Sequence, residues 1–147
     1  MLPIAEAKAI FSDATVLLEE RSPASVESAF GVPLVQSTLA AVDPARACTW
    51  GVPNSGGGFT GAVASVTESE RTALGAALTA AGFSSANMGM VAGFDQSMET
   101  EMGEVAETHL FTGEVWIMVN APSAGTSGGI AGLLLDSMRT ANPSHGL

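Results

Sequence analysis

The feature that most constrains the fold is the apolar run Val-Trp-Ile-Met-Val at residues 115–119. A run this short, rich in β-branched and aromatic residues, predicts a central β-strand rather than a helix. A tight turn is expected at Thr112 and Gly113. Before it, His109 and Phe111 alternate with their neighbours as a half-buried partner strand requires. We therefore expect a hairpin over residues 107–121, with every other element packed on or beside it.

The N-terminal part of the chain indicates helices. Apolar residues recur at helical spacing over residues 3–20, at Ile4, Ala7, Phe11, Ala14 and Leu18. This face suits packing on the protein's own core, and it also suits a short dimer seam. The β-branched residues at positions 15 and 16 weaken the helix toward its end, so a break near position 12 is left open.

A second helix is expected from Ser22, as N-cap, and Pro23 to Gly31. Pro33 then forbids its continuation. A strand followed by a loop is left open over residues 34–42, and a turn follows at residues 43 and 44.

The middle of the chain predicts a second hairpin and a well-defined helix. Residues 46–52 and 59–66 are expected to form strands joined by a glycine-rich loop. Thr67 and Glu70 then form a capping box that starts a helix ending at Gly82. A short strand is expected at residues 88–93, and a polar loop with one helical turn at residues 94–104.

After the central hairpin, residues 122–129 are expected to form a loop. Ser127 is expected to cap a last helix whose apolar face is Ile130, Leu133, Leu134 and Met138. Residues 142–147 are expected to form a tail.

This order of elements predicts an α+β fold, with an antiparallel sheet of about five strands and helices packed on one face. We expect a single domain over residues 1–147, with a helical segment at 1–20, a core at 22–141 and the tail. Each hairpin is followed at once by a capped helix. Two similar halves are therefore left open.

Charge and composition exclude several functions. The formal net charge is −10, with 5 Lys and Arg residues in 147. Nucleic-acid binding and binding to anionic lipid both need a cationic patch, so neither is expected. No apolar run approaches the roughly 20 residues that a transmembrane helix needs. The N-terminus lacks a basic start and an apolar signal core. We therefore expect either a cytoplasmic protein or an exported one whose signal has been removed.

Several short motifs occur in an order that resembles a known group of proteins. They are residues 22–34, the Cys-Thr-Trp stretch ending at Trp50, residues 91–95, the strand at 115–119 and a closing amphipathic helix. The order is similar to that of small secreted proteins and lipoproteins of actinobacteria with a Cys-x-Trp strand, some of which resemble extracellular sensor domains. Such proteins usually pair that cysteine with a second one, which this chain lacks. The resemblance implies an exported, non-enzymatic module and supplies no catalytic residues.

Candidate chemical groups are few. The acidic residues Asp95, Glu99, Glu101, Glu104, Glu107 and Glu114 are interpreted as a solvated face, with a calcium site as the alternative. His109 is interpreted as structural, because no motif places a nucleophile or carboxylate beside it. The glycine-rich residues 125–129 resemble an anion-binding loop but lack the P-loop lysine. Cys48, the only cysteine, is interpreted as a small buried hydrophobe. We expect no metal and no cofactor.

The sequence therefore favours a non-enzymatic extracytoplasmic module that binds a partner protein or a small apolar ligand. The predicted ligand or partner surface comprises Trp50, Met90, Phe94, Asp95, Trp116 and Met118, with the two tryptophans flanking an apolar groove. One alternative is a structural, homodimeric protein built on the N-terminal helical face. The other is a hydrolase-type enzyme that uses His109 and a carboxylate such as Glu107 or Glu114.

Overall fold

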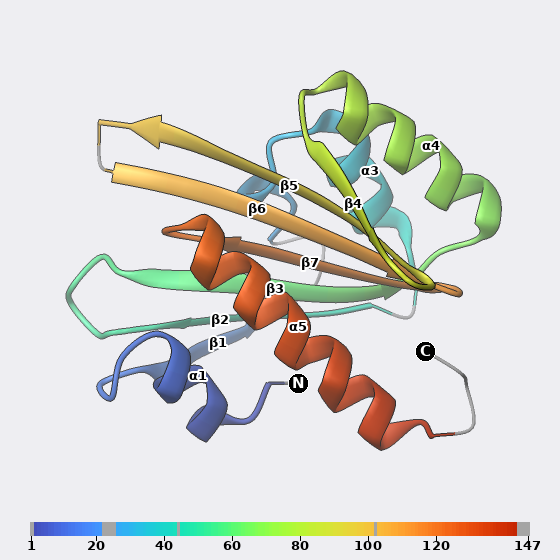
Figure 1. The fold of residues 1–147 in the computed structure, drawn as a ribbon. Helices are drawn as coiled ribbons and strands as arrows, with labels where there is room; N and C mark the ends of the chain where they lie inside the picture. Colours follow the sequence, from blue (N-terminus) through green and yellow to red (C-terminus); the bar gives the residue numbers. More distant parts are fainter. Residues whose placement is uncertain (1, 22–25, 44, 102, 144–147) are drawn as a thin grey trace.

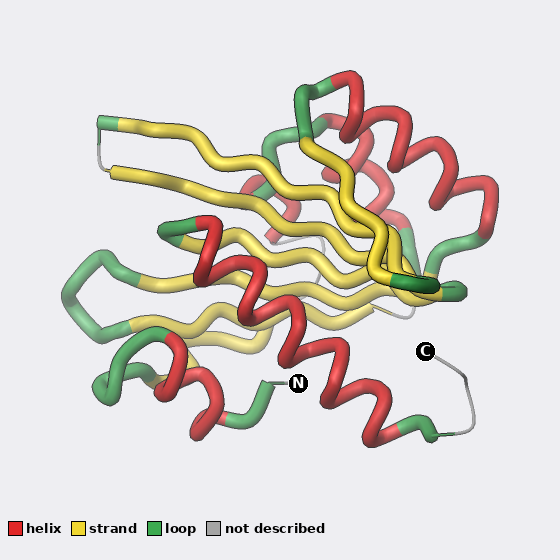
Figure 2. Tube along the Cα trace, viewed as in Figure 1, coloured by secondary structure: helices red, strands yellow, loops and turns green. Residues whose placement is uncertain are grey.

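Over the residues that the structure describes, the chain forms an antiparallel seven-stranded sheet with helices on both faces, as the computed structural model shows (Figures 1 and 2). The structure describes residues 2–21, 26–43, 45–101 and 103–143. The strand order is β1-β2-β3-β7-β6-β5-β4, so the first three strands and the last four each form a meander. The two meanders join where β3 pairs with β7.

The strands are β1 (Val16–Arg21), β2 (Ala45–Gly51), β3 (Gly58–Ser65), β4 (Ser84–Met88), β5 (Val91–Thr100), β6 (Gly103–Thr112) and β7 (Val115–Ala121). The helices are α1 (Ile4–Ile10), the 3₁₀ turn η1 (Glu27–Ala29), α3 (Pro33–Ala41), α4 (Glu68–Ala80) and α5 (Ala124–Ala141).

Strand β7 is apolar on both faces, and this property sets the layering. Trp116 and Met118 pack into the core on the side of α3 and α4, while Ile117 and Val119 pack into the core on the side of α1 and α5. A strand with apolar side chains on both faces must be covered by other elements on each face. The α+β class is confirmed, but the predictions of helices on one face and of about five strands are wrong.

The N-terminal helix is shorter than predicted. Helix α1 ends at Ile10, and Val16–Arg21 form an edge strand paired with β2. β-branched residues at positions 15 and 16 favour extended backbone, and the pairing with β2 outweighs the helical spacing of the apolar residues. The predicted helical face therefore does not exist, because Leu18 lies on a strand.

Two further segments differ from the prediction. Pro33 begins helix α3 rather than ending a helix, because proline suits the first helical position. Residues 94–100, predicted as a loop, continue β5, whose outer half pairs with β6 in an arm exposed on both faces. Because neither face of that half is buried, its apolar and polar residues do not alternate, and the sequence gives no strand signal there. The helix start predicted at Ser22 and Pro23 lies outside the described residues.

The elements with strong local signals are confirmed. The central hairpin turns at Gly113, whose φ of 54° suits glycine. Helix α4 begins with the complete Thr67–Glu70 capping box, and Gly82, with φ of 91°, follows its end. Helix α5 begins earlier than predicted, because Ser123 rather than Ser127 is its N-cap. The two predicted hairpins, β2–β3 and β6–β7, are each followed by a capped helix, but the two helices cover opposite faces of the sheet.

None of the helices in the described ranges is both long enough and apolar enough to cross a lipid bilayer.

Candidate functional site

The candidate site is a groove between the C-terminal half of α5 and strands β2 and β3. Helix α5 runs diagonally across its face of the sheet (Figure 1). Beside it lies a hollow of about 460 Å³, with far more apolar than polar surface. This volume falls within the roughly 300–1,000 Å³ typical of pockets for small ligands. Its principal lining residues are Arg46, Cys48, Trp50, Gly61, Val63, Leu134, Ser137, Met138 and Asn142.

Strand alternation explains why these side chains meet. Arg46, Cys48 and Trp50 are two residues apart on β2, so they project from the same face of the sheet. Opposite them, β3 contributes Gly61 and Val63, which pair with Cys48 and Arg46. A Cβ at Gly61 would lie 3.3 Å from Leu134 Cδ1 and 3.4 Å from the Trp50 ring. Because glycine has no side chain, Leu134 of α5 and the Trp50 indole can both pack closely against β3 at this position.

An aromatic stack supports the Trp50 ring of the groove. The Trp50 ring lies parallel to that of Phe59, with centroids 5.1 Å apart, and Phe11 meets Phe59 edge to face at 5.6 Å. Trp50 is only 2 % exposed. Such pairs hold the rings in place, so this wall is rigid rather than adaptable.

Cys48 contributes an apolar surface rather than a nucleophile. Burial, followed by the charge of Glu20, raises the pKa of the Cys48 thiol, and the charge of Arg46 only partly opposes this. The thiolate is the reactive form of cysteine, so a raised pKa keeps this side chain protonated at neutral pH. The prediction of Cys48 as a small buried hydrophobe agrees with its 2 % exposure.

A buried polar cluster lies on the opposite face of the sheet, at Glu107, His109 and Trp116. Trp116 Nε1 lies 3.3 Å from His109 Nδ1, and His109 Nε2 lies 3.4 Å from Glu107 Oε2. The indole N–H can only donate, so Nδ1 must accept and the imidazole carries its proton on Nε2, directed at Glu107. The other carboxylate oxygen accepts from the Gly31 amide at 2.7 Å.

This cluster lies almost entirely out of contact with solvent. The His109 side chain is fully buried, between the rings of Phe30 and Phe83. A substrate could reach the imidazole only by displacing that aromatic cover. The cluster instead ties the backbone at Gly31 to the centre of the sheet, and it satisfies polar groups that burial would otherwise penalise.

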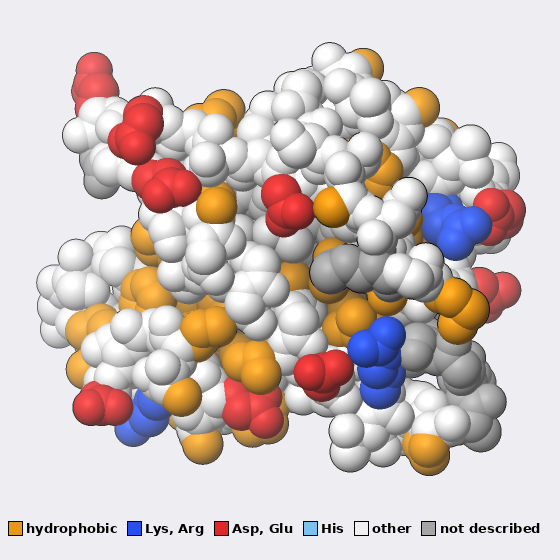
Figure 3. Space-filling model, in the orientation of Figure 1, with side chains coloured by type: hydrophobic (Ala, Val, Ile, Leu, Met, Phe, Trp, Pro, Cys, Tyr) orange, Lys and Arg blue, Asp and Glu red, His pale blue; other side chains and the backbone are white. Residues whose placement is uncertain are grey.

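The acidic residues do not converge on one point. Asp95 accepts from Thr108 Oγ1 at 2.7 Å, and Glu104 accepts from the Ala124 amide at the start of α5 at 3.1 Å. Acidic side chains gather over the outer end of the β5–β6 hairpin (Figure 3), where Glu99 and Glu104 pair directly across the strands. Within the described ranges, no three His, Cys, Asp or Glu side chains are grouped to hold a metal ion.

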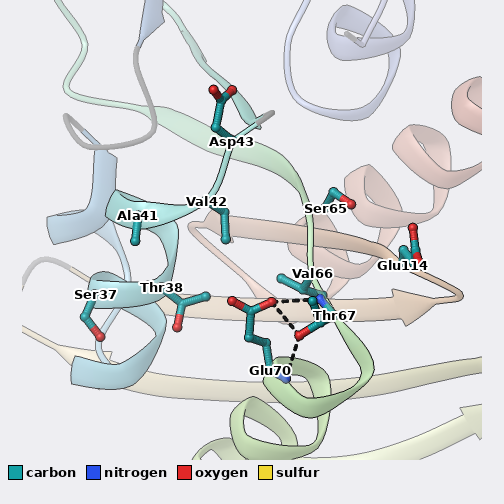
Figure 4. Close-up of a pocket in the computed structure, with 10 residues that line it drawn as sticks. All are labelled: Ser37, Thr38, Ala41, Val42, Asp43, Ser65, Val66, Thr67, Glu70 and Glu114. Atoms are coloured by element: carbon teal, nitrogen blue, oxygen red, sulfur yellow. Dashed lines mark hydrogen bonds between the residues drawn. The ribbon is translucent and has the colours of Figure 1, made fainter.

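A second hollow lies between α3 and the start of α4 (Figure 4). Its lining includes Asp43, Glu70 and Glu114, but Glu70 is turned back into the capping box with Thr67, while the other two carboxylates point away from it. The loop predicted at residues 122–129 is wrong from residue 124 onward, and the glycine-rich residues 125–129 lie within α5.

The predicted ligand or partner surface does not form one surface. Trp50 lines the groove, whereas Trp116 and Met118 are fully buried on the other face and cannot flank it. Met90 is 76 % exposed after β4, and Phe94 packs beside α4. Asp95, on β5, lies beside α5 but outside the groove.

Sequence reasoning missed most of the groove, namely Arg46, Val63, Ser137 and the part played by Leu134 and Met138. The alternation of Arg46, Cys48 and Trp50 and the apolar face of the last helix were visible signals. That these two faces meet depends on the strand order, which no local pattern encodes.

Comparison with models of protein families, with curated proteins and with solved structures finds no match for the chain.

Proposed function

We propose that this protein is a non-enzymatic binding module that holds a small apolar ligand in the groove beside α5. The observation that carries the proposal is the groove itself, about 460 Å³ and walled by Trp50, Val63, Leu134 and Met138. Burying a ligand there removes apolar surface from water on both partners, at roughly 25 cal/mol per Å² before the costs of association.

The enzyme alternative has less support. His109 and Glu107 do lie within reach of each other, at 3.4 Å, but both are buried and already partnered. A general base must reach the proton that it abstracts in a bound substrate. Here the aromatic rings of Phe30 and Phe83 pack against the His109 imidazole and occupy the space that a bound substrate would need.

The test is a direct binding titration with N-phenyl-1-naphthylamine, a neutral apolar dye whose fluorescence rises when it leaves water. We expect the dye to bind the native protein, and binding to weaken at least ten-fold in Ser137→Phe. This variant introduces a ring on a partly exposed residue of the groove wall. Thr140→Phe is the matched control, because Thr140 lies three residues along α5, is exposed and is outside the lining. Equal binding by all three proteins would refute the groove as the site.

We further propose an extracytoplasmic location, supported by the motif resemblance around Cys48 and Trp50. Fractionation of cells that express the native gene tests it. Recovery of the protein in the cytoplasmic fraction alone would reject the location but leave the groove unaffected.

Self-association through strand β1 is a second candidate, in place of the dimer seam predicted on the N-terminal helix. β1 is an edge strand, and its Val16, Leu17 and Leu18 are 39 %, 40 % and 50 % exposed. Exposed apolar edge strands pair readily with other strands, although a register shift between Leu17 and Glu19 and the charges that follow oppose this. Sedimentation across a wide concentration range tests it: a monomer throughout rejects this candidate.

A further inference from the structure

We propose that the ligand of the groove is an amphipathic carboxylate, with its apolar body against Trp50 and its carboxylate at Arg46. This inference rests on the proposed function and adds the chemical class of the ligand.

Arg46 marks one end of an otherwise apolar strand face. It lies two residues from Cys48 and four from Trp50 on the same face of β2, and it is exposed where Trp50 is buried. With a rise of about 3.3 Å per residue, Arg46 and Trp50 are about 13 Å apart along the strand. A ligand lying along β2 would thus meet an apolar wall at one end and a guanidinium at the other.

The ion pairing of the arginines distinguishes Arg46 from the others whose side chains are described. Arg71 pairs with Glu68 and Arg139 with Asp136, in each case three residues earlier on the same helix. Arg46 makes no ion pair with any described residue. A guanidinium presents planar donors that match a carboxylate, so it is suited to an anionic head group.

Glu20 is the competing charge. It pairs with Cys48 across β1 and β2, so it lies on the same face of the sheet as Arg46 and the groove. Glu20 does not form an ion pair with Arg46, and its charge acts on the Cys48 thiol in opposition to that of Arg46. Removing Glu20 should therefore strengthen the binding of a carboxylate.

The remaining polar groups at the groove are less suited to binding a charged head. Ser137 and Asn142 are neutral, and the Asn142 side chain already donates to the Met138 carbonyl at 3.0 Å. Among the described residues that line the groove, Arg46 is the one cation, and one guanidinium suits a single negative charge. A phosphate monoester, with about two negative charges and three acceptor oxygens, would keep more of its charge unpaired beside one guanidinium.

The experiment compares three ligands with the same twelve-carbon chain: dodecanoate, dodecanol and dodecyltrimethylammonium. Each displaces N-phenyl-1-naphthylamine, below its critical micelle concentration and at physiological salt. We expect dodecanoate to bind tightest. In Arg46→Gln the affinity for dodecanoate should fall about three- to five-fold, which is the scale of a partly exposed charge pair. The affinities for dodecanol and for the dye should remain unchanged.

Variants make the result specific to the guanidinium. Arg46→Lys should recover part of the loss, Glu20→Gln should strengthen dodecanoate binding, and Arg71→Gln, on α4 away from the groove, should change nothing. Thermal melts confirm that each variant is folded.

Each contrary outcome identifies what has failed. If the dye and all three ligands fail to bind, the proposed function falls and this inference with it. If dodecanol and dodecanoate bind equally in the native protein and in Arg46→Gln, the groove stands and the carboxylate assignment is overturned. Tightest binding by dodecyltrimethylammonium would overturn it as well, and would make Glu20 the partner of the head group.

Discussion

At the scale of single residues, Trp116 anchors the core on the α3–α4 side. Its side chain is fully buried, stacks on Phe111 with centroids 5.8 Å apart, and donates to His109. It therefore combines a large apolar area with a polar contact that no smaller side chain reproduces.

Trp116→Ala should lower the free energy of unfolding by about 3–5 kcal/mol, the usual cost of emptying a large aromatic site in a core. Urea denaturation monitored by circular dichroism measures it. Met90→Ala is the control, because that side chain is 76 % exposed and its loss should cost almost nothing. An unchanged midpoint for Trp116→Ala would contradict its place in the core.

Glu107 illustrates how a buried carboxylate can serve structure. Replacing it with alanine leaves the Gly31 amide and the His109 Nε2–H without their acceptor. We expect a loss of about 1–3 kcal/mol in the free energy of unfolding, the cost of an unsatisfied buried donor. Glu114→Ala, at an exposed turn, serves as the matched control in the same urea titration. If both variants lose equally little, the Glu107 contacts contribute no stability.

At the scale of elements, the start of α4 is the clearest local device. The Thr67 side chain accepts from the Glu70 amide, and the Glu70 carboxylate accepts from the Thr67 amide at 2.7 Å. Thr67→Ala should cost about 1 kcal/mol of unfolding free energy, as loss of an N-cap does. Thr72→Ala, an exposed threonine within the same helix, is the control. Alanine favours a helix interior more than threonine does, so Thr72→Ala should lose nothing, and equal losses in thermal denaturation would contradict the capping role.

The same box predicts a pH dependence. Hydrogen bonds from the Thr67 amide and hydroxyl hold the pKa of Glu70 below its ordinary value. A lowered folded-state pKa means that the ionised carboxylate stabilises the fold above the unfolded-state pKa, and that this contribution disappears as pH falls through the folded-state pKa. The melting temperature of the native protein should exceed that of Glu70→Ala at neutral pH, and the gap should narrow in strong acid. A constant gap across that range would contradict the role of the charge.

At the scale of the whole molecule, acidity is the dominant property. The net charge is −10, and Glu99 faces Glu104 across the β5–β6 hairpin. Like charges placed directly opposite are destabilising, and salt screens their repulsion over about 8 Å at physiological ionic strength. We therefore expect sodium chloride to raise the melting temperature modestly.

Calcium at matched ionic strength should raise the melting temperature no more than sodium chloride does. A specific site would stabilise the native state by about 2.7 kcal/mol at a hundredfold excess over its dissociation constant, which screening cannot imitate. Thermal melts with calcium, magnesium and sodium chloride decide it. A rise of several degrees with calcium alone would overturn the solvated-face interpretation and direct mutagenesis to Asp95, Glu99, Glu101 and Glu104.

The sequence alone was sufficient for the features that depend on neighbouring residues. The capping box at Thr67 and Glu70, the turn at Gly113 and the two hairpins all follow from contacts within a few positions. The α+β class also follows, because strands arranged in neighbouring antiparallel pairs favour that class over alternating βαβ units. In each case the favourable interaction is local, so the pattern is readable before the fold is known.

Only the tertiary structure decided the rest. Residues 16–21 and 94–100 become strands through hydrogen bonds to β2 and β6, and these partners compensate for weak local preferences. The face that each helix covers follows from β7, which is apolar on both sides. The groove arises because β3 pairs with β7, which brings Trp50 and Arg46 beside a helix more than 70 residues later in the chain. Such long-range contacts depend on strand order, which local periodicity does not record.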